Sequence, residues 1–370
     1  MIPVNEPVIS REAKQNVQKA LRTGWLSSSG SFVKQFEEEF ARYLGMRHAV
    51  AVTSGTAALH VALLSLGIGR GDEVIVPAFT MAATWMAVMY TGAAPVFVDC
   101  ERETYNIDVK KIERAITQRT RVIIPVHIYG HACDMNGIAR IAKRHSLAVV
   151  EDAAEALGGV YRGKKCGILG DINCFSFYAN KIVTCGEGGM VVTNKTALAK
   201  RARRFRDLCH TEDKRFIHDD LGYNYRMTNL QAAVGVGELR NIKSYLTRKH
   251  EMAKTYKKGL RGIPGIRLPA TKSYVKNTYW MYAIVIDEKK FGMSRDSLRE
   301  KLKQQGVDSR DFFYAPEDQP VLKKIIGKQK FPTTKYLSEH GLYLPSGLAI
   351  TSAQIATVCK KVKSIQRNNQ

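Results

Sequence analysis

A lysine lies at the mouth of a glycine-rich turn, just after a mostly apolar run at residues 172–178. This residue, Lys181, is the only Lys or Arg between Asp171 and Lys195. Apolar surroundings disfavour the charged form of an amine, so Lys181 has the character of a nucleophile toward a carbonyl group. A lysine at a strand end can also simply point into water, which is a common arrangement. The residues that converge on Lys181 decide between these interpretations.

Two further segments carry groups suited to chemistry beside such a lysine. Residues 52–58 contain a strand end, a small-residue turn and a helix start, and Gly55 and Thr56 offer N–H groups and a hydroxyl to a phosphate. Asp152 follows another strand, where a carboxylate would keep a pyridine nitrogen protonated. Either segment alone could be an ordinary helix cap. Together with Lys181 they meet the requirements of pyridoxal phosphate catalysis.

The elements that must position these residues are short strands alternating with helices. Strands are expected at residues 49–52, 73–76, 94–98, 121–125 and 148–151, and helices at residues 55–66, 81–90, 108–116 and 134–145. This alternation is typical of an α/β fold with a mostly parallel sheet covered by helices on both faces. Ligands of such sheets bind at the carboxyl ends of the strands.

Helices are also expected on either side of this alternating region. The pattern predicts them at residues 10–22, 31–43 and 195–205, and as one long helix over residues 228–260. A Gly-Ile-Pro-Gly segment at residues 262–265 marks a boundary between a large α/β domain, residues 1–260, and a small α+β domain, residues 261–370. In the small domain we expect a strand at residues 278–286 and helices at residues 294–305 and 352–365.

Composition excludes several classes of protein. The seven cysteines form no C-x-x-C pair and the histidines form no H-E-x-x-H motif, so neither a disulfide framework nor a metal site is expected. No apolar stretch approaches the roughly 20 residues of a membrane span, and the first residues lack the build of a signal peptide, so the expected location is cytoplasmic, away from membranes. The net charge of +23 favours anionic partners such as phosphate-bearing cofactors and nucleotide-linked substrates.

Five motifs, in chain order, resemble those of the DegT/DnrJ-type sugar aminotransferases. They are Thr53-Ser-Gly-Thr56, Glu151-Asp-Ala-Ala-Glu155, Phe175-Ser-Phe-Tyr-Ala-Asn-Lys181, Gly186-Glu-Gly-Gly189 and Gly222-Tyr-Asn-Tyr-Arg-Met-Thr-Asn229. Within that family the chain is most similar to perosamine-synthase-like 4-aminotransferases, which act on nucleotide-linked 4-keto-6-deoxy sugars. The resemblance covers nearly the whole chain. It implies pyridoxal phosphate as cofactor, the aspartate-aminotransferase fold (fold type I) and a homodimer with shared active sites.

The resemblance also implies roles for single residues. Lys181 would be the Schiff-base lysine, Asp152 the partner of the pyridine nitrogen, and Glu155 a neighbour of the phenolic oxygen. An amino acid, with glutamate expected, would leave its amino group on the cofactor for transfer to the sugar ketone, and Lys181 would carry protons between substrate and cofactor. The phosphate would be held by Gly55, Thr56, Ser176 and, from the other subunit, Asn224.

Two positions depart from the family pattern. Met81 stands where the family usually has an aromatic residue stacked on the pyridine ring, although a thioether can also pack against a π-face. Glu317 stands near where relatives carry a histidine beside the sugar nucleotide, and an acid is a poor neighbour for a pyrophosphate. These departures leave open which nucleotide and which sugar the chain accepts.

Other functions are weighed against this one. A 3-aminotransferase of the same family is the nearest alternative. A dehydratase using the same cofactor would carry histidine in place of Lys181, which counts against it. A nucleic-acid-binding regulator would use the positive charge, but no helix-turn-helix, zinc finger or RNA-binding aromatic motif is visible. The expected partners are therefore a nucleotide sugar and an amino-acid donor, with no nucleic acid.

Overall fold

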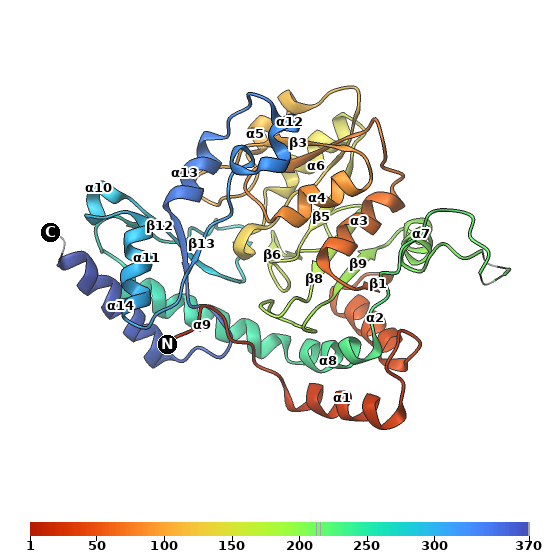
Figure 1. Cartoon of the computed structure of the whole chain (residues 1–370), viewed down its shortest axis with the longest axis horizontal. Coiled ribbons are helices and arrows are strands. Elements are labelled where there is room, and N and C mark those ends of the chain that lie inside the picture. The colour runs from red at the N-terminus through yellow and green to blue at the C-terminus, as the bar shows by residue number, and fades with distance from the viewer. Residues whose placement is uncertain (212, 215, 369–370) are drawn as a thin grey trace.

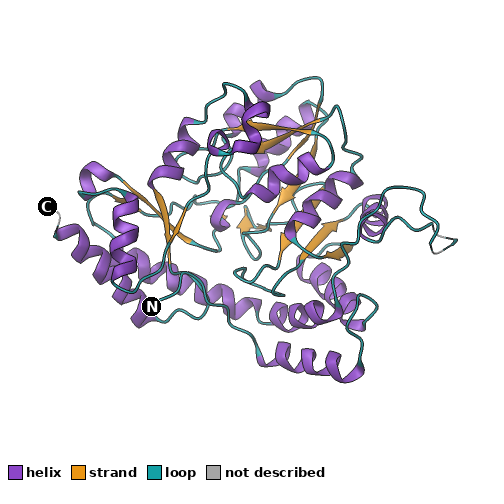
Figure 2. Cartoon of the chain, viewed as in Figure 1, coloured by secondary structure: helices purple, strands orange, loops and turns teal. Residues whose placement is uncertain are grey.

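A seven-stranded sheet forms the centre of the computed structural model, which describes residues 1–211, 213–214 and 216–368 (Figure 2). Neighbouring strands are parallel except at β9, which runs antiparallel to both its neighbours. In spatial order the strands are β1 His48–Val52, β9 Gly189–Thr193, β8 Ile172–Ser176, β5 Ala148–Asp152, β4 Thr120–Ile123, β2 Glu73–Pro77 and β3 Ala94–Val98. The expected mostly parallel sheet is confirmed.

Helices cover this sheet on both faces and extend below it (Figure 1). They are α1 Arg11–Thr23, α2 Ser31–Leu44, α3 Gly55–Ser65, α4 Ala82–Tyr90, α5 Val109–Ile112, α6 Met135–Arg144, α7 Thr196–Arg206, α8 Asn229–Arg240 and α9 Ile242–Leu260. Because both faces are covered, strands such as β2 and β9 are buried along their whole length. Among the described residues no helix is both long and apolar enough to cross a membrane.

The single long helix expected over residues 228–260 is wrong, because α8 and α9 are separate. The break is at Asn241, with φ −92° and ψ 1°. Its side-chain amide donates to the Gly237 carbonyl at 2.8 Å, and asparagine side chains that bond the backbone compete with helix continuation. The break lets α8 pack beside α1 while α9 leads toward the C-terminal part (Figure 1).

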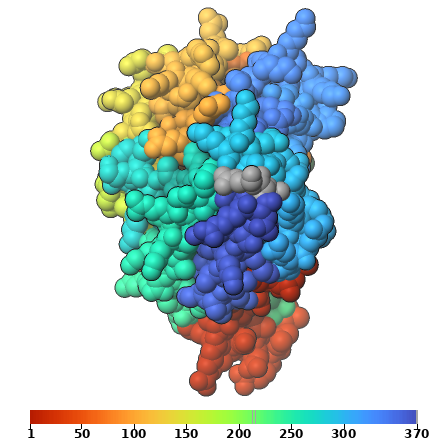
Figure 3. All heavy atoms as spheres, turned by 90° about the vertical axis from the view of Figure 1, so that its left-hand side faces the viewer, coloured from red at the N-terminus to blue at the C-terminus, as the bar shows by residue number. Residues whose placement is uncertain are grey.

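A smaller antiparallel sheet follows α9. Its strands, in spatial order, are β10 Ile266–Arg267, β12 Tyr282–Ile286, β14 Gly341–Leu344 and β13 Arg310–Asp311. Its helices are α10 Glu288–Phe291, α11 Arg295–Gln304, α12 Lys323–Ile326, α13 Pro332–His340 and α14 Ser352–Arg367. At the surface α14 lies beside α9 (Figure 3). The domain boundary at residue 260 stays a prediction, and a short sheet of β11 Val275–Lys276, β6 Val160–Tyr161 and β7 Lys164–Lys165 crosses it.

The strand expected over residues 278–286 begins only at Tyr282, so its first part is wrong. Tyr279 has φ 49°, which no strand residue adopts. The N–H of Thr278 donates to the Gly130 carbonyl at 3.2 Å, which ties this segment to the loop after β4. Residues 278–281 are therefore drawn away from the small sheet and toward the ends of the large one.

Candidate active site

Lys181 lies in the turn after β8, five residues beyond Ser176. Its backbone N–H donates to the Tyr178 carbonyl at 2.8 Å. Its Nζ lies 3.6 Å from the centroid of the Trp280 ring, and the indole N–H of Trp280 donates to the Asn180 carbonyl at 2.8 Å. The lysine therefore does not simply point into water, because its amine rests on an aromatic face that attracts a cation.

Two buried carboxyl groups share the surroundings of this amine. Asp152, the last residue of β5, and Glu155 are each 4% exposed. Burial raises the pKa of both carboxyls, and the nearby Lys181 amine opposes that rise. Burial lowers the pKa of Lys181, while Glu155 and Asp152 oppose the change. The three groups are thus electrostatically coupled, and the charge of each depends on the others.

Hydrogen bonds hold both carboxyl groups in place. The Thr84 hydroxyl and the Ala154 N–H each donate to the Asp152 carboxylate at 3.1 Å. The Tyr129 N–H donates to Glu155 Oε2 at 2.7 Å. The next element after β5 is the strand β6, so Asp152 does not serve as the cap of a following helix.

The N-terminus of α3 forms a cradle of small residues beside the end of β8. The Ser54 hydroxyl accepts the Ala57 N–H at 3.1 Å, so this segment is a helix cap as well. The first N–H groups of a helix, here at Gly55 and Thr56, lack acceptors within the helix and lie at its positive end. A Cβ on Gly55 would lie 2.8 Å from Ser176 Cβ, so only glycine allows this close approach. An anion the size of a phosphate suits this cradle.

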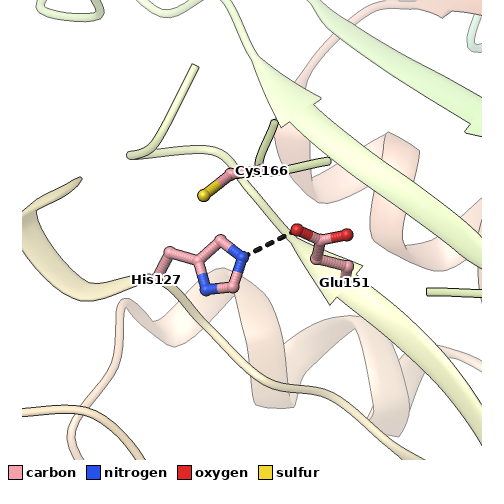
Figure 4. A group of neighbouring side chains, drawn as sticks. All are labelled: His127, Glu151 and Cys166. Carbon is pink, nitrogen blue, oxygen red and sulfur yellow. Dashed lines mark hydrogen bonds and ion pairs between the residues drawn. The ribbon is translucent and has the colours of Figure 1, made fainter. Parts of the chain in front are cut away.

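His127, Glu151 and Cys166 form a buried cluster (Figure 4), and the His127 backbone N–H donates to the Asp152 carbonyl at 3.2 Å. His127 Nε2 donates to Glu151 Oε1 at 2.7 Å, and His127 Nδ1 accepts the Cys133 N–H at 3.1 Å. Both Glu151 oxygens accept further N–H groups, from Gly167, Leu169 and Gly170. Burial raises the pKa of the Cys166 thiol, which keeps it protonated. These bonds use both imidazole nitrogens, so the cluster supports β5.

A cavity of about 510 Å³ opens between the start of α4 and the small sheet. Its lining includes Met81 and the cations Arg299, Lys303 and Arg310. Arg299 is paired with Asp311 at 2.5 Å. Within the described residues, no acid pairs with Lys303 or Arg310. Asp308 and Asp311 also line the cavity, so three cations and two acids leave its lining with a formal net charge of +1, which favours an anionic ligand.

Of the two positions that depart from the family pattern, Met81 lines this cavity and Glu317 does not. Met81 is 54% exposed, and it precedes by one turn Thr84, which bonds Asp152. Glu317 is not among the lining residues, and its Oε1 accepts the Phe331 N–H at 3.4 Å. The acid at position 317 is thus turned toward the start of α13 and poses no obstacle to an anion in the cavity.

One predicted residue is not brought to this site. Asn224 is exposed and forms an isolated bridge with Asp207. In the described part of the chain, no hydrogen bond joins its side chain to Gly55, Thr56 or Ser176. The other predicted residues lie at or just after the ends of β5 and β8 and at the start of α3, and Met81 lies one helical turn before Thr84, which bonds Asp152.

The residues that sequence reasoning missed are Trp280, Thr84, Tyr129 and His127. Tyr129 and His127 follow β4, so the rule that ligands gather after strand ends would have found them. Thr84 is one helical turn after Met81, on a helix that was expected. Nothing in the sequence places Trp280 under Lys181, because that contact joins segments one hundred residues apart.

An amine beside two buried acids, with a phosphate cradle that only glycine allows at residue 55, defines a protein that uses pyridoxal phosphate. A profile of the DegT/DnrJ/EryC1/StrS aminotransferase family matches residues 7–363. The chain belongs to this family and is a pyridoxal-phosphate-dependent aminotransferase.

Individual relatives agree over the full length of the chain. GDP-perosamine synthase of Escherichia coli O157:H7 is 40% identical over 98% of this chain and 97% of its own. The structure of S. venezuelae DesV in complex with a ketimine intermediate superposes with a TM-score of 0.90 at 34% identity, covering 98% of this chain and 99% of DesV. The pyridoxal phosphate form of a putative sugar aminotransferase from Streptococcus pneumoniae gives a TM-score of 0.93 at 26% identity, covering 100% and 99%. The fold expected from the sequence is confirmed.

Proposed function

We propose that this aminotransferase moves an amino group from an amino acid, glutamate, to C4 of a nucleotide-linked 4-keto-6-deoxy sugar. The observation that carries the proposal is the 40% identity to a GDP-perosamine synthase over 98% of the chain. The geometry supports it, because Thr84, which bonds Asp152, also bonds Thr80 at 2.9 Å, and Thr80 lines a cavity whose cations outnumber its acids. When bound, pyridoxal phosphate supplies an aldehyde that takes up amino groups and a ring that withdraws electrons.

The roles of the cofactor residues follow from their surroundings. Asp152 would keep the proton on the ring nitrogen, since a carboxylate beside that nitrogen favours its charged form. Glu155 would lie near the other ring substituents, held by the Tyr129 N–H. The N–H groups of Gly55 and Thr56 would hold the phosphate. The Lys181 amine, freed from the cofactor, would take and return the proton at the reacting carbon, and burial favours the neutral form needed for this.

The substrate side rests on the cavity. A nucleotide sugar carries two negative phosphates between base and sugar, and the side chains of Lys303 and Arg310 would pair with them. The sugar ketone would then lie toward Met81 and Lys181. The test is incubation of the purified enzyme with glutamate and a panel of nucleotide-linked 4-keto and 3-keto sugars, followed by NMR of the products. Amination at C3, or of none of these sugars, would overturn the proposal.

The enzyme is proposed to act as a homodimer in which Asn224 reaches the phosphate in the partner's site. Large apolar side chains are exposed on loops of this chain, among them Trp25, Tyr178 and Leu221. A second copy of the chain would cover them.

Mixing two inactive variants tests this arrangement. If Asn224 acts across the interface, a mixture of Lys181→Ala and Asn224→Ala chains forms heterodimers with one intact site, which restores about one quarter of wild-type activity after random exchange. Each variant alone stays inactive. No recovery, together with a dimer by light scattering, would show that Asn224 serves its own chain.

A further inference from the structure

One buried lysine has no part in the chemistry described so far. Lys249 lies in the middle of α9 and is 2% exposed. Its Nζ donates to the Trp280 carbonyl at 2.8 Å and also to the Ser346 carbonyl. Burial lowers the pKa of Lys249 to about 7. Two N–H donors remain on an uncharged amine, so Lys249 can hold both carbonyls in either charge state.

The two carbonyls belong to the ends of the central pair of strands in the small sheet. Trp280 comes just before β12 and Ser346 just after β14, and these strands pair Tyr282 with Leu344. The Ser346 hydroxyl donates to the Leu344 carbonyl and accepts the Tyr282 N–H at 2.8 Å. The Lys249 amine therefore holds together the segment before β12 and the segment after β14.

The same point carries the aromatic face under the reactive lysine. The Trp280 ring centroid lies 3.6 Å from Lys181 Nζ, and its indole N–H bonds the residue before Lys181. Lys181 and Lys249 also line the same small cavity. A shift of the Trp280 backbone would therefore move the surface on which the Lys181 amine rests.

We propose that Lys249 is a positioning residue for transamination, which holds the backbone of Trp280 so that the indole ring lies under the amine of Lys181. This goes beyond the choice of sugar and rests only on Lys181 being the lysine that carries the cofactor. Borohydride reduction of the holoenzyme, followed by peptide mass spectrometry, checks that premise separately. If the reduced cofactor is found on Lys181, the premise holds. If it is found on Lys249, both this proposal and the assignment of Lys181 are overturned.

The variant Lys249→Met tests the proposal, because methionine keeps the length and removes the donors. The matched control is Tyr256→Phe on the same helix, which removes a buried hydroxyl donating to the Pro345 carbonyl at 2.8 Å. Like Lys249→Met, Tyr256→Phe removes a hydrogen bond between α9 and the segment after β14. It leaves the bond from Lys249 to the Trp280 carbonyl in place. We expect Lys249→Met to lower kcat about tenfold with little change in KM, while Tyr256→Phe lowers the melting temperature and leaves kcat unchanged.

A spectroscopic readout separates positioning from general loosening. A ring face stabilises the protonated form of a group above it, while Glu155 and Asp152 act on Lys181 in the same direction. Removing Lys249 should therefore move the pH midpoint of the bound cofactor's absorbance to lower values. The proposal would be contradicted if Lys249→Met kept both the wild-type pH midpoint of the absorbance and the wild-type kcat. It would also be contradicted if Lys249→Met and Tyr256→Phe had equal effects.

A second variant covers the case in which Lys249→Met does not fold. Trp280→Leu removes the ring and leaves the backbone carbonyl that Lys249 bonds, so it should give the same shift of the midpoint and a similar loss of kcat. In the double variant, if it folds, the two losses should not multiply, because both act through one ring. Lys249 does not act through Trp280 if the two losses in kcat multiply in the double variant, or if Trp280→Leu keeps the wild-type pH midpoint of the absorbance.

Discussion

The two halves of the active site are built in opposite ways. On the cofactor side, Asp152 and Glu155 are buried and each is fixed by a backbone N–H. On the substrate side, Met81 and Tyr314 are more than half exposed, and they line a cavity whose three cations outnumber its two acids. The chemistry is thus preorganised by the sheet, whereas recognition is left to flexible side chains at the surface.

This difference follows from where each half is attached. Asp152 ends a central strand with β4 and β8 on either side, and the His127–Glu151 pair supports it from behind. The cavity lies between α4 and the short strand β13, which is at the edge of the small sheet and pairs with β14. Changes on the cofactor side should therefore reduce kcat for every substrate, while changes on the substrate side should alter KM for the sugar nucleotide alone.

The largest effect is expected at Lys181. Lys181→Ala removes the amine that rests on Trp280 and is coupled to the two acids, so turnover should fall about 10³-fold or more. The visible absorbance of lysine-bound pyridoxal phosphate should disappear as well. Lys195→Ala, which breaks an exposed ion pair with Asp171, is the control and should keep both properties. Full transaminase activity of Lys181→Ala with any amino donor would refute the assignment of Lys181 as the lysine that carries the cofactor.

Asp152→Asn should cost about 10²-fold in kcat, because the amide keeps the shape but not the charge that holds a proton on the ring. Steady-state rates with glutamate and the sugar nucleotide measure the loss. Asp99→Asn is a matched control, since Asp99 is also a buried acid at a strand end, bonded by Thr334. It should lower the melting temperature and leave kcat unchanged. Equal losses in both variants would mean that Asp152 serves only the fold.

On the substrate side, Arg310→Ala should raise KM for the sugar nucleotide about tenfold, the effect of losing one charge-assisted hydrogen bond. Neither kcat nor KM for glutamate should change, because Arg310 lines the cavity proposed for the sugar nucleotide, and that lining does not include Lys181, Asp152 or Glu155. Arg310→Lys keeps the charge and should recover most of the affinity at low salt. A fall in kcat with unchanged KM would place Arg310 in the chemistry and remove the contrast between the halves.

The difference between residues fixed by the large sheet and residues placed by distant contacts also explains which parts of the fold and the site could be predicted from the sequence. Lys181 and Asp152 could be found because β5 and β8 are parallel neighbours, so residues that follow them meet at one edge of the sheet. Trp280 could not be found, since the positive φ of Tyr279 and the bond from Thr278 to Gly130 arise only in the folded chain. The break at Asn241 was missed for a similar reason. The helix propensity of asparagine is only slightly unfavourable, and the packing of α8 beside α1 decides the direction of the chain.

The smallest effect is expected at Met81, where the two halves meet. Met81 precedes α4 with φ −61° and ψ 140°, a conformation open to any residue, and its side chain is 54% exposed. Met81→Tyr should therefore be tolerated and, by giving the cofactor ring an aromatic face, should tighten pyridoxal phosphate binding about threefold. Met81→Ala should weaken it by a similar factor, because the thioether contact is lost. Titration of the apoenzyme with pyridoxal phosphate measures both. If Met81→Tyr instead raises KM for the sugar nucleotide and leaves cofactor affinity unchanged, Met81 belongs to the substrate half, and the boundary between the halves lies closer to Asp152.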